Sequence, residues 1–167
     1  GSALEFACGE GSDALLLAEL GFEVTALDFA PSAVRIVESR AASCGLRVHV
    51  MASDVTTFQT EERFDLGLMA FLHLSADAQR SAVDALTRSI RPGGCFLYVG
   101  LTNVDEDHEG RPAPDAYPGP ETISERLQGF TVERSEVIRR TLPMPHGDDL
   151  EEDTVIIRAR RDGILCE

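Results

Sequence analysis

The sequence predicts an α/β fold: a doubly wound, mostly parallel sheet of seven strands with an antiparallel hairpin at its C-terminal edge. Three observations predict it. Strand-like apolar runs alternate with helical stretches over residues 1–100, which is typical of right-handed crossovers in a parallel sheet. Glycines mark the first passage from strand to helix, in ALEFACGEG at 3–11. The last two strand-like runs have only a loop between them.

Each element follows from periodicity and from the residues that end it. The expected strands are 3–7, 23–28, 48–51, 64–69, 95–100, 130–138 and 153–160. The expected helices are 12–20, 31–44, 75–90 and 121–128. Pro31 suits a first helical turn, Ser75 is a plausible N-cap, and Pro92 with two glycines stops the third helix. The Pro- and Asp-rich segment 142–152 predicts a hairpin connection.

A chain of 167 residues has the length of one domain and can bury about 70% of its unfolded surface. We therefore expect residues 1–167 to form a single domain. Residues 1–2, Gly-Ser, are interpreted as a tag remnant. The structureless segment 101–120 is interpreted as a binding loop or lid, because it follows a strand of the sheet.

The first strand leads into a turn that suits a nucleotide-like cofactor. Gly9 and Gly11 allow close approach of the backbone, and the following helix offers free N–H groups. Asp28, at the end of the second strand, stands where a carboxylate accepts ribose hydroxyls. The same residues fit the G-x-G-x-x-[GA] pattern of dinucleotide sites, so a nicotinamide cofactor is an open alternative.

Glu5 is a carboxylate inside an otherwise apolar strand, shortly before Gly9. Beside a pyrophosphate, two anions would repel each other in a poorly screened pocket. A cofactor that carries an ammonium and a sulfonium group gives this charge a partner. Glu5 therefore favours such a cofactor over a dinucleotide.

Residues 5–11 resemble motif I of the class I S-adenosylmethionine-dependent methyltransferases, an acid-x-G-x-G-x-G pattern. Glu5 is the acid, Gly9 and Gly11 are the second and third glycines, and Ala7 replaces the first, which leaves a slightly tighter turn. The resemblance continues in order to about Arg160. The small bacterial, tellurite-resistance-like methyltransferases are the nearest group. The resemblance implies a Rossmann-like sheet with the terminal hairpin, S-adenosylmethionine as cofactor and S-adenosylhomocysteine as product.

The resemblance also implies where the cofactor binds. Asp28 matches the ribose-binding acid, Phe29 is placed against the adenine, and Ser53-Asp54-Val55 matches the contact to the adenine amine. The expected cofactor-binding residues are Glu5, Ala7, Cys8, Gly9, Gly11, Asp28, Phe29, Ser53, Asp54, Val55, Met69 and Ala70. Members of this family carry helices ahead of the first strand, and we expect these to be missing here. Truncation and a natural minimal form are the alternatives, and the Gly-Ser start favours truncation.

Methyl transfer from a sulfonium depends mainly on alignment, and a general base is needed only if the acceptor must lose a proton. His73 is the candidate catalytic base, because it lies in the turn after the fourth strand and titrates near neutrality. A structural role at the entry to a helix is the alternative. His108 and Tyr117, in the segment 101–120, are weaker candidates.

Composition limits the partners. Acids outnumber bases by 29 to 15, a formal charge of −14, which argues against nucleic-acid binding. No run approaches the roughly 18 apolar residues of a membrane span, and no signal peptide is seen. The four cysteines are scattered, which favours reduced thiols in a cytoplasmic protein and no metal site. Cys8 is expected to be a small apolar filler.

Acidic side chains gather in the loops where we expect a small-molecule acceptor to enter. These are Asp105, Glu106, Asp107, Glu109, Asp148, Asp149, Glu151 and Glu152. They would favour a cationic or neutral acceptor, or they merely face water. Two other functions stay open: a nicotinamide-dependent oxidoreductase, and a non-catalytic domain that retains the cofactor. The acceptor and the oligomeric state are not predicted.

Overall fold

The computed structural model describes residues 1–102, 116–142 and 150–163. Within these ranges seven strands form one sheet of order β3-β2-β1-β4-β5-β7-β6. The strands are β1 (Ser2–Phe6), β2 (Glu23–Asp28), β3 (Val48–Ala52), β4 (Phe64–Ala70), β5 (Ile90–Thr102), β6 (Phe130–Leu142) and β7 (Leu150–Arg161). The first five pair in parallel, and β7 runs antiparallel between β5 and β6. The predicted fold class is confirmed.

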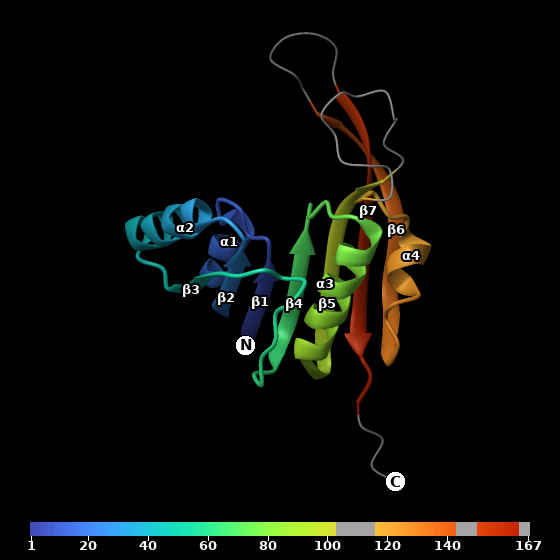
Figure 1. Cartoon of the computed structure of the whole chain (residues 1–167), viewed down its shortest axis with the longest axis horizontal. Helices are drawn as coiled ribbons and strands as arrows, with labels where there is room; N and C mark the ends of the chain where they lie inside the picture. Colours follow the sequence, from blue (N-terminus) through green and yellow to red (C-terminus); the bar gives the residue numbers. More distant parts are fainter. Residues whose placement is uncertain (103–115, 143–149, 164–167) are drawn as a thin grey trace.

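Helices cover parts of both faces of this sheet (Figure 1). They are α1 (Ser12–Glu19), α2 (Pro31–Cys44), α3 (Ala76–Ser89) and α4 (Pro120–Ser124). On one face, α3 packs Val83 and Leu86 against strand residues such as Phe6. On the other face, Leu17 of α1 and Val37 of α2 belong to a second core with β1 and β2. Burial of these side chains contributes about 1.5–3 kcal/mol each.

Several predicted boundaries need correction. β5 begins at Ile90 rather than 95, because Ile90 pairs with Phe64 before a register shift. The hairpin strands continue past their predicted ends because their pairing extends to Leu142 and Leu150. α4 ends earlier than predicted. Ser75 occupies the N-cap position of α3, but its side chain makes no capping hydrogen bond.

The segment 101–120, predicted to be a loop or lid, is only partly described. Residues 101–102 continue β5, residue 120 begins α4, and residues 103–115 lie outside the described residues. These two residues of β5 were missed because pairing with Thr154 and Asp153 of β7 extends the strand beyond its apolar run. The interpretation of the remainder as a binding loop stays a prediction.

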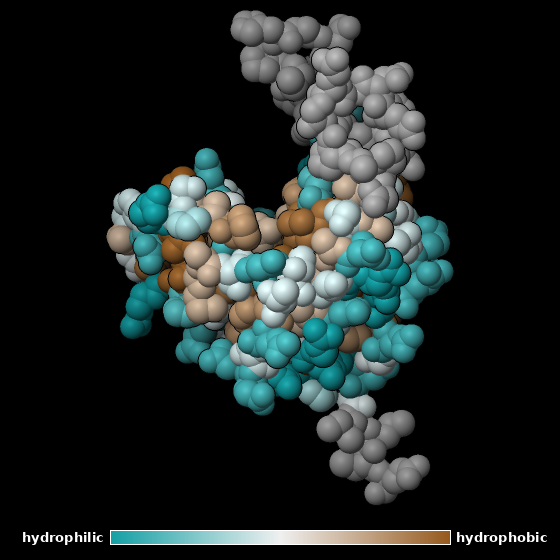
Figure 2. Space-filling view, in the orientation of Figure 1, coloured by the Kyte–Doolittle hydropathy of each residue, from teal (hydrophilic) through white to brown (hydrophobic). Residues whose placement is uncertain are grey.

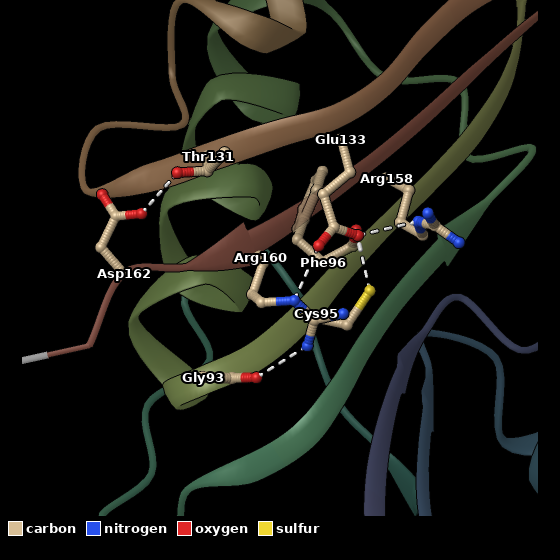
Figure 3. A network of polar contacts seen from close by, with 8 residues as sticks. All are labelled: Gly93, Cys95, Phe96, Thr131, Glu133, Arg158, Arg160 and Asp162. Carbon is tan, nitrogen blue, oxygen red and sulfur yellow. Dashed lines mark hydrogen bonds and ion pairs between the residues drawn. The ribbon is translucent and has the colours of Figure 1, made fainter.

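Ion pairs join the two strands of the hairpin, and a hydrogen bond links the hairpin to the start of β5 (Figure 3). The Glu133 carboxylate accepts a hydrogen bond from Arg160 Nε at 2.7 Å and pairs with Arg158 Nε at 3.0 Å. Arg160 Nη1 also donates to the carbonyl oxygen of Gly93 at 3.1 Å. These contacts lie at the amino end of β5. The opposite rim, formed by the carboxyl ends of the parallel strands, is where ligands bind in such sheets.

Candidate functional site

The chain leaves β1 through a turn with left-handed backbone angles. Ala7, Gly9 and Gly11 have φ values of 58°, 52° and 78°. Cys8 N donates to Leu27 O at 2.9 Å, and Gly11 N donates to Cys8 O at 2.8 Å, so the turn is held against β2. The left-handed region costs a residue with a side chain about 1–2 kcal/mol. Ala7 therefore adds strain where the methyltransferase motif has glycine.

Gly11 is required by packing as well as by backbone angle. A Cβ atom at this position would lie 2.6 Å from Cγ2 of Val37, a fully buried residue of α2. Arg40, also on α2, donates from Nη1 to Glu10 O at 2.5 Å. Two residues of α2, Val37 and Arg40, thus hold the turn in place. No sequence signal indicated this role of Arg40.

Asp28 ties the turn to the end of β2. Its Oδ2 accepts a hydrogen bond from Gly9 N at 2.8 Å, and its Oδ1 accepts one from Ala30 N at 2.9 Å. Each carboxylate oxygen can accept a further bond, so the predicted ribose contact is compatible with this geometry. Asp28 also organises the glycine turn, which the sequence did not indicate.

Glu5 is buried beside this turn, with 3% of its surface exposed. Its Oε2 has no hydrogen-bond partner among the described residues. Burial, together with the negative charges of Asp13 and Asp28, raises the pKa of Glu5 to about 8. A buried carboxylate without a counter-charge is costly. A cationic ligand group in the turn would supply one.

Cys8, in the same turn, is a buried thiol. Burial raises the pKa of Cys8 to about 12, and the charges of Glu5 and Asp28 act in the same direction. The thiol is therefore protonated at neutral pH and has little nucleophilic character. This environment supports its interpretation as an apolar filler.

The residues predicted to face adenine lie around the ends of β2 and β3. Phe29 is 80% exposed, a large apolar ring without cover among the described residues. Ser53 N donates to Asp28 O at 2.9 Å. Asp54 Oδ1 accepts hydrogen bonds from N and Oγ1 of Thr56 at 2.8 and 2.7 Å, and these bonds lower the pKa of Asp54. Val55 is buried in the core.

At the end of β4, the predicted cofactor residues Met69 and Ala70 and the catalytic candidate His73 differ in what they can offer a ligand. Met69 is fully buried against the α3 face, so only its backbone is available to a ligand. Ala70 is half-buried on the α1 face. The His73 ring lies 5.0 Å from the Tyr117 ring, centroid to centroid. The structure thus brings two predicted candidates together, whereas His108 lies outside the described residues.

Two residues that the sequence did not single out lie at the same rim. Phe71 follows β4 with φ of 51° and is 42% exposed. Arg140, from β6, places its guanidinium 5.2 Å from the centre of the Phe71 ring. Phe71 lies in the turn after the fourth strand, where His73 was predicted as a base, but no local pattern connects Phe71 with an arginine almost 70 residues later.

Other predicted features are tested only within the described part of the chain. There, no group of three or more His, Cys, Asp or Glu is placed to hold a metal, and no helix has the length and apolarity of a bilayer span. Cys8, Cys44 and Cys95 are free thiols. Residues 105–109 and Cys166 lie outside the described residues.

Residues 3–94 match the family described as "Methyltransferase domain". The chain belongs to this family. It is 32% identical over 103 residues to hemagglutinin 1 of Eikenella corrodens, covering 60% of this chain and 34% of that protein. It is 30% identical over 104 residues to a ubiquinone biosynthesis O-methyltransferase of Methylobacterium nodulans, covering 62% and 42%. This methyltransferase domain thus spans less than half the length of these curated relatives.

Solved structures share its fold. TehB from Haemophilus influenzae superposes with a TM-score of 0.81 and 18% identity, over 96% of this domain and 57% of that chain. The N-methyltransferase NodS from Bradyrhizobium japonicum, in complex with S-adenosyl-L-homocysteine, gives 0.69 and 24%, over 96% and 78%. A curated relative from Haemophilus influenzae, 22% identical over 105 residues, is named a probable S-adenosyl-L-methionine-dependent methyltransferase TehB, in agreement with the class predicted from the sequence.

The family assignment agrees with S-adenosylmethionine as the cofactor, and the residues present fit it. Glu5 holds a buried oxygen without a partner, which suits an ammonium group. Asp28 retains acceptor capacity for ribose hydroxyls, and Phe29 offers an exposed ring for adenine. Figure 2 shows the molecule hollowed between the lobe of α1 and α2 and the side of the hairpin, with apolar surface along this hollow.

Proposed function

We propose that this domain transfers a methyl group from S-adenosylmethionine to a small-molecule acceptor in the cytoplasm. One observation carries the proposal: Glu5 is a buried carboxylate whose Oε2 lacks a partner among the described residues, and it lies beside the glycine turn. A dinucleotide would place phosphate charge near this carboxylate. An amino acid end would place an ammonium there.

The chain's own residues then have separable tasks. Glu5 binds the ammonium, Asp28 the ribose, and Phe29 with Asp54 the adenine. The bound cofactor supplies a methyl group on a positively charged sulfur, so the leaving group is already activated. What remains for the protein is to hold the acceptor in line, which can supply on the order of 7–11 kcal/mol.

His73 is proposed as the base for an acceptor that must lose a proton. It follows β4 at the rim and contacts the Tyr117 ring. The relative named as an O-methyltransferase favours an oxygen acceptor, whose proton must go to a base. General-base catalysis contributes about 10²- to 10⁴-fold. If His73 has only a structural role, its replacement by Gln will change stability without changing the pH profile of turnover.

The first test compares ligands. We expect calorimetry to show binding of S-adenosylhomocysteine, with NAD and NADP failing to bind. Asp28→Ala should weaken this binding by about 5- to 150-fold, through the loss of about 1–3 kcal/mol of hydrogen bonding. Glu23→Ala, at the exposed opposite end of β2, is the matched control. Binding of NAD instead, or an unchanged affinity in Asp28→Ala, would contradict the proposed site.

Two alternatives remain distinguishable from methyl transfer. A nicotinamide-dependent oxidoreductase predicts NAD binding and leaves the buried carboxyl group of Glu5 without a ligand partner. A non-catalytic domain predicts binding of S-adenosylhomocysteine without a transferred methyl group. A screen with methyl-labelled S-adenosylmethionine against a panel of small hydroxyl, amine and carboxylate compounds separates the latter from an enzyme.

A further inference from the structure

Arg140 has a buried side-chain donor without a hydrogen-bond partner among the described residues. Its Nη2 donates to Glu152 Oε2 at 3.0 Å, and its guanidinium lies over the Phe71 ring. Its Nε is buried and has no hydrogen-bond partner among the described residues. Glu152 and Phe71 therefore hold the guanidinium in place, while its Nε–H group is left for a ligand.

A second polar atom without a partner lies beside it. Thr154 is 1% exposed, and its Oγ1 has no hydrogen-bond partner among the described residues. In the β6–β7 ladder, Arg140 pairs with Glu152 and Ile138 pairs with Thr154. Residues two positions apart in a strand share one face of the sheet. Arg140 of β6 and Thr154 of β7 therefore lie on the same face, as diagonal neighbours across the two paired strands.

The strand register places this pair on the face that carries Glu5. Glu5 pairs with Leu68, and Ala70, two residues further along β4, pairs with Val99. Val99 pairs with Ile156, and Leu101 pairs with Thr154. Each pair shares a face of the sheet, so one continuous face runs from Glu5 to Thr154 and on to Arg140.

The rim position also suits an acceptor. Phe71 directly follows β4, the strand next to β1, and Phe71 N donates to Val99 O at 2.7 Å. Its left-handed φ is unusual for a bulky residue, and such residues cluster at ligand sites. Its half-exposed ring, with the guanidinium above it, forms an apolar edge next to a charged donor.

We propose that Arg140 and Thr154 bind a carboxylate group of the methyl acceptor, with Phe71 packing against the adjoining apolar part. Both groups are hydrogen-bond donors that an anionic oxygen satisfies, and guanidinium matches carboxylate in shape. The inference rests on the proposed function, because it assigns the substrate class of that same site.

This inference opposes the cationic or neutral acceptor expected from the acidic loops. Glu152 is paired with Arg140, and Asp153 is paired with Arg139 through Nε at 2.9 Å. The charges of these two acids are therefore compensated locally. Of the other acids in the predicted group, Glu151 is exposed, and those at 105–109 and 148–149 lie outside the described residues. The buried donors, rather than the count of acids, decide the acceptor class.

The test observes Arg140 directly. In ¹⁵N-labelled protein loaded with S-adenosylhomocysteine, the Nε–H resonance of Arg140 is assigned by its absence from Arg140→Met. Acetate, benzoate and inorganic phosphate are titrated against sodium chloride at equal ionic strength, and benzamide serves as the uncharged match of benzoate. We expect benzoate to shift this resonance saturably and to bind at least tenfold more tightly than benzamide.

Two variants test which side chains bind benzoate. Thr154→Val should weaken benzoate binding several-fold. Arg139→Met removes the neighbouring arginine, whose partner Asp153 lies on the opposite face, and should leave benzoate binding unchanged. A resonance that none of the carboxylates shifts, or equal affinity for benzoate and benzamide, would overturn the inference. A preference for phosphate over both carboxylates would also overturn it. Failure of S-adenosylhomocysteine to bind would instead refute the proposed function.

Discussion

Polar side chains at the rim fall into two groups. Asp28, Asp54 and Glu152 accept hydrogen bonds from neighbouring groups. Glu5 and Thr154 are almost completely buried, and each has a side-chain oxygen without a partner among the described residues. A buried polar atom without a partner costs about 1–3 kcal/mol. At the residue scale, these atoms mark where ligand groups are expected.

The protonation of Glu5 gives a prediction for cofactor affinity. With its pKa near 8, Glu5 is protonated at neutral pH in the free protein and must lose that proton to pair with an ammonium. The affinity for S-adenosylhomocysteine should therefore rise by up to tenfold per pH unit from about pH 6 to about pH 8. Calorimetry in buffers of different ionisation enthalpy measures the released proton. Glu5→Gln should bind more weakly and lose this pH dependence, and a pH-independent affinity in the unmodified protein would refute the assignment.

Unfolding experiments check the same group without ligand. The folded-state pKa of Glu5 lies above its ordinary value of 4.5, so its contribution is fully present below about pH 4.5. Between about pH 4.5 and pH 8 only the unfolded chain releases the proton, and the free energy of unfolding falls by up to 1.4 kcal/mol per pH unit. Glu5→Gln should show a smaller fall over this range.

At the element scale, the cofactor turn depends on the contact between α1 and α2. Gly11 ends the turn and precedes α1, and its lack of a side chain leaves room for Val37 of α2. Asp28 fixes the other side of the turn to β2. Three elements therefore determine the turn, and its shape does not depend on the glycines alone.

Gly11→Ala should destabilise the domain more than an equivalent change elsewhere. The left-handed angle costs about 1–2 kcal/mol, and the overlap with Val37 adds about 1–3 kcal/mol. Gly45→Ala is the matched control, since Gly45 has φ of 67° and open space around its Cβ position. Gly45→Ala should lose only the free energy that the left-handed backbone angle costs. Urea unfolding gives both values, and equal losses in the two variants would mean that the packing contact is not limiting.

At the scale of the whole molecule, the rim joins residues that are far apart in the chain. The carboxyl ends of β1, β2, β4 and β5 meet at one edge, and β6 ends there too because it is parallel to β5 across β7. The predicted cofactor residues come from β1, β2 and β4 and from the turns after β1, β2 and β3. The proposed acceptor residues come from β4 and the hairpin.

Net charge predicts how salt affects the whole domain. A formal charge of −14 destabilises a compact chain through self-repulsion. Raising sodium chloride from about 0.01 M to about 0.15 M shortens the Debye length from about 30 Å to about 8 Å. Because single surface ion pairs contribute little, we expect the melting temperature to rise, as measured by calorimetry at constant pH. A decrease would show that the arginine pairs of the hairpin outweigh the general repulsion.

The sequence by itself determined the fold class and located the glycine turn with the carboxylates beside it. Apolar periodicity and glycine spacing are local properties, so they revealed the alternation of strands and helices, the turn at Gly9 and Gly11, and the carboxylates Glu5 and Asp28. The ends of β5, β6 and β7 were less predictable, because pairing with neighbouring strands extends them past their apolar runs.

Only the tertiary structure decided which polar atoms lack partners and which distant residues meet. The contact of Arg140 with Phe71, and the face that Thr154 shares with Glu5, depend on strand order and register. The pKa of Glu5 depends on its burial between Asp13 and Asp28. Such properties arise when folding removes water and brings separate segments together, so no local pattern in the chain encodes them.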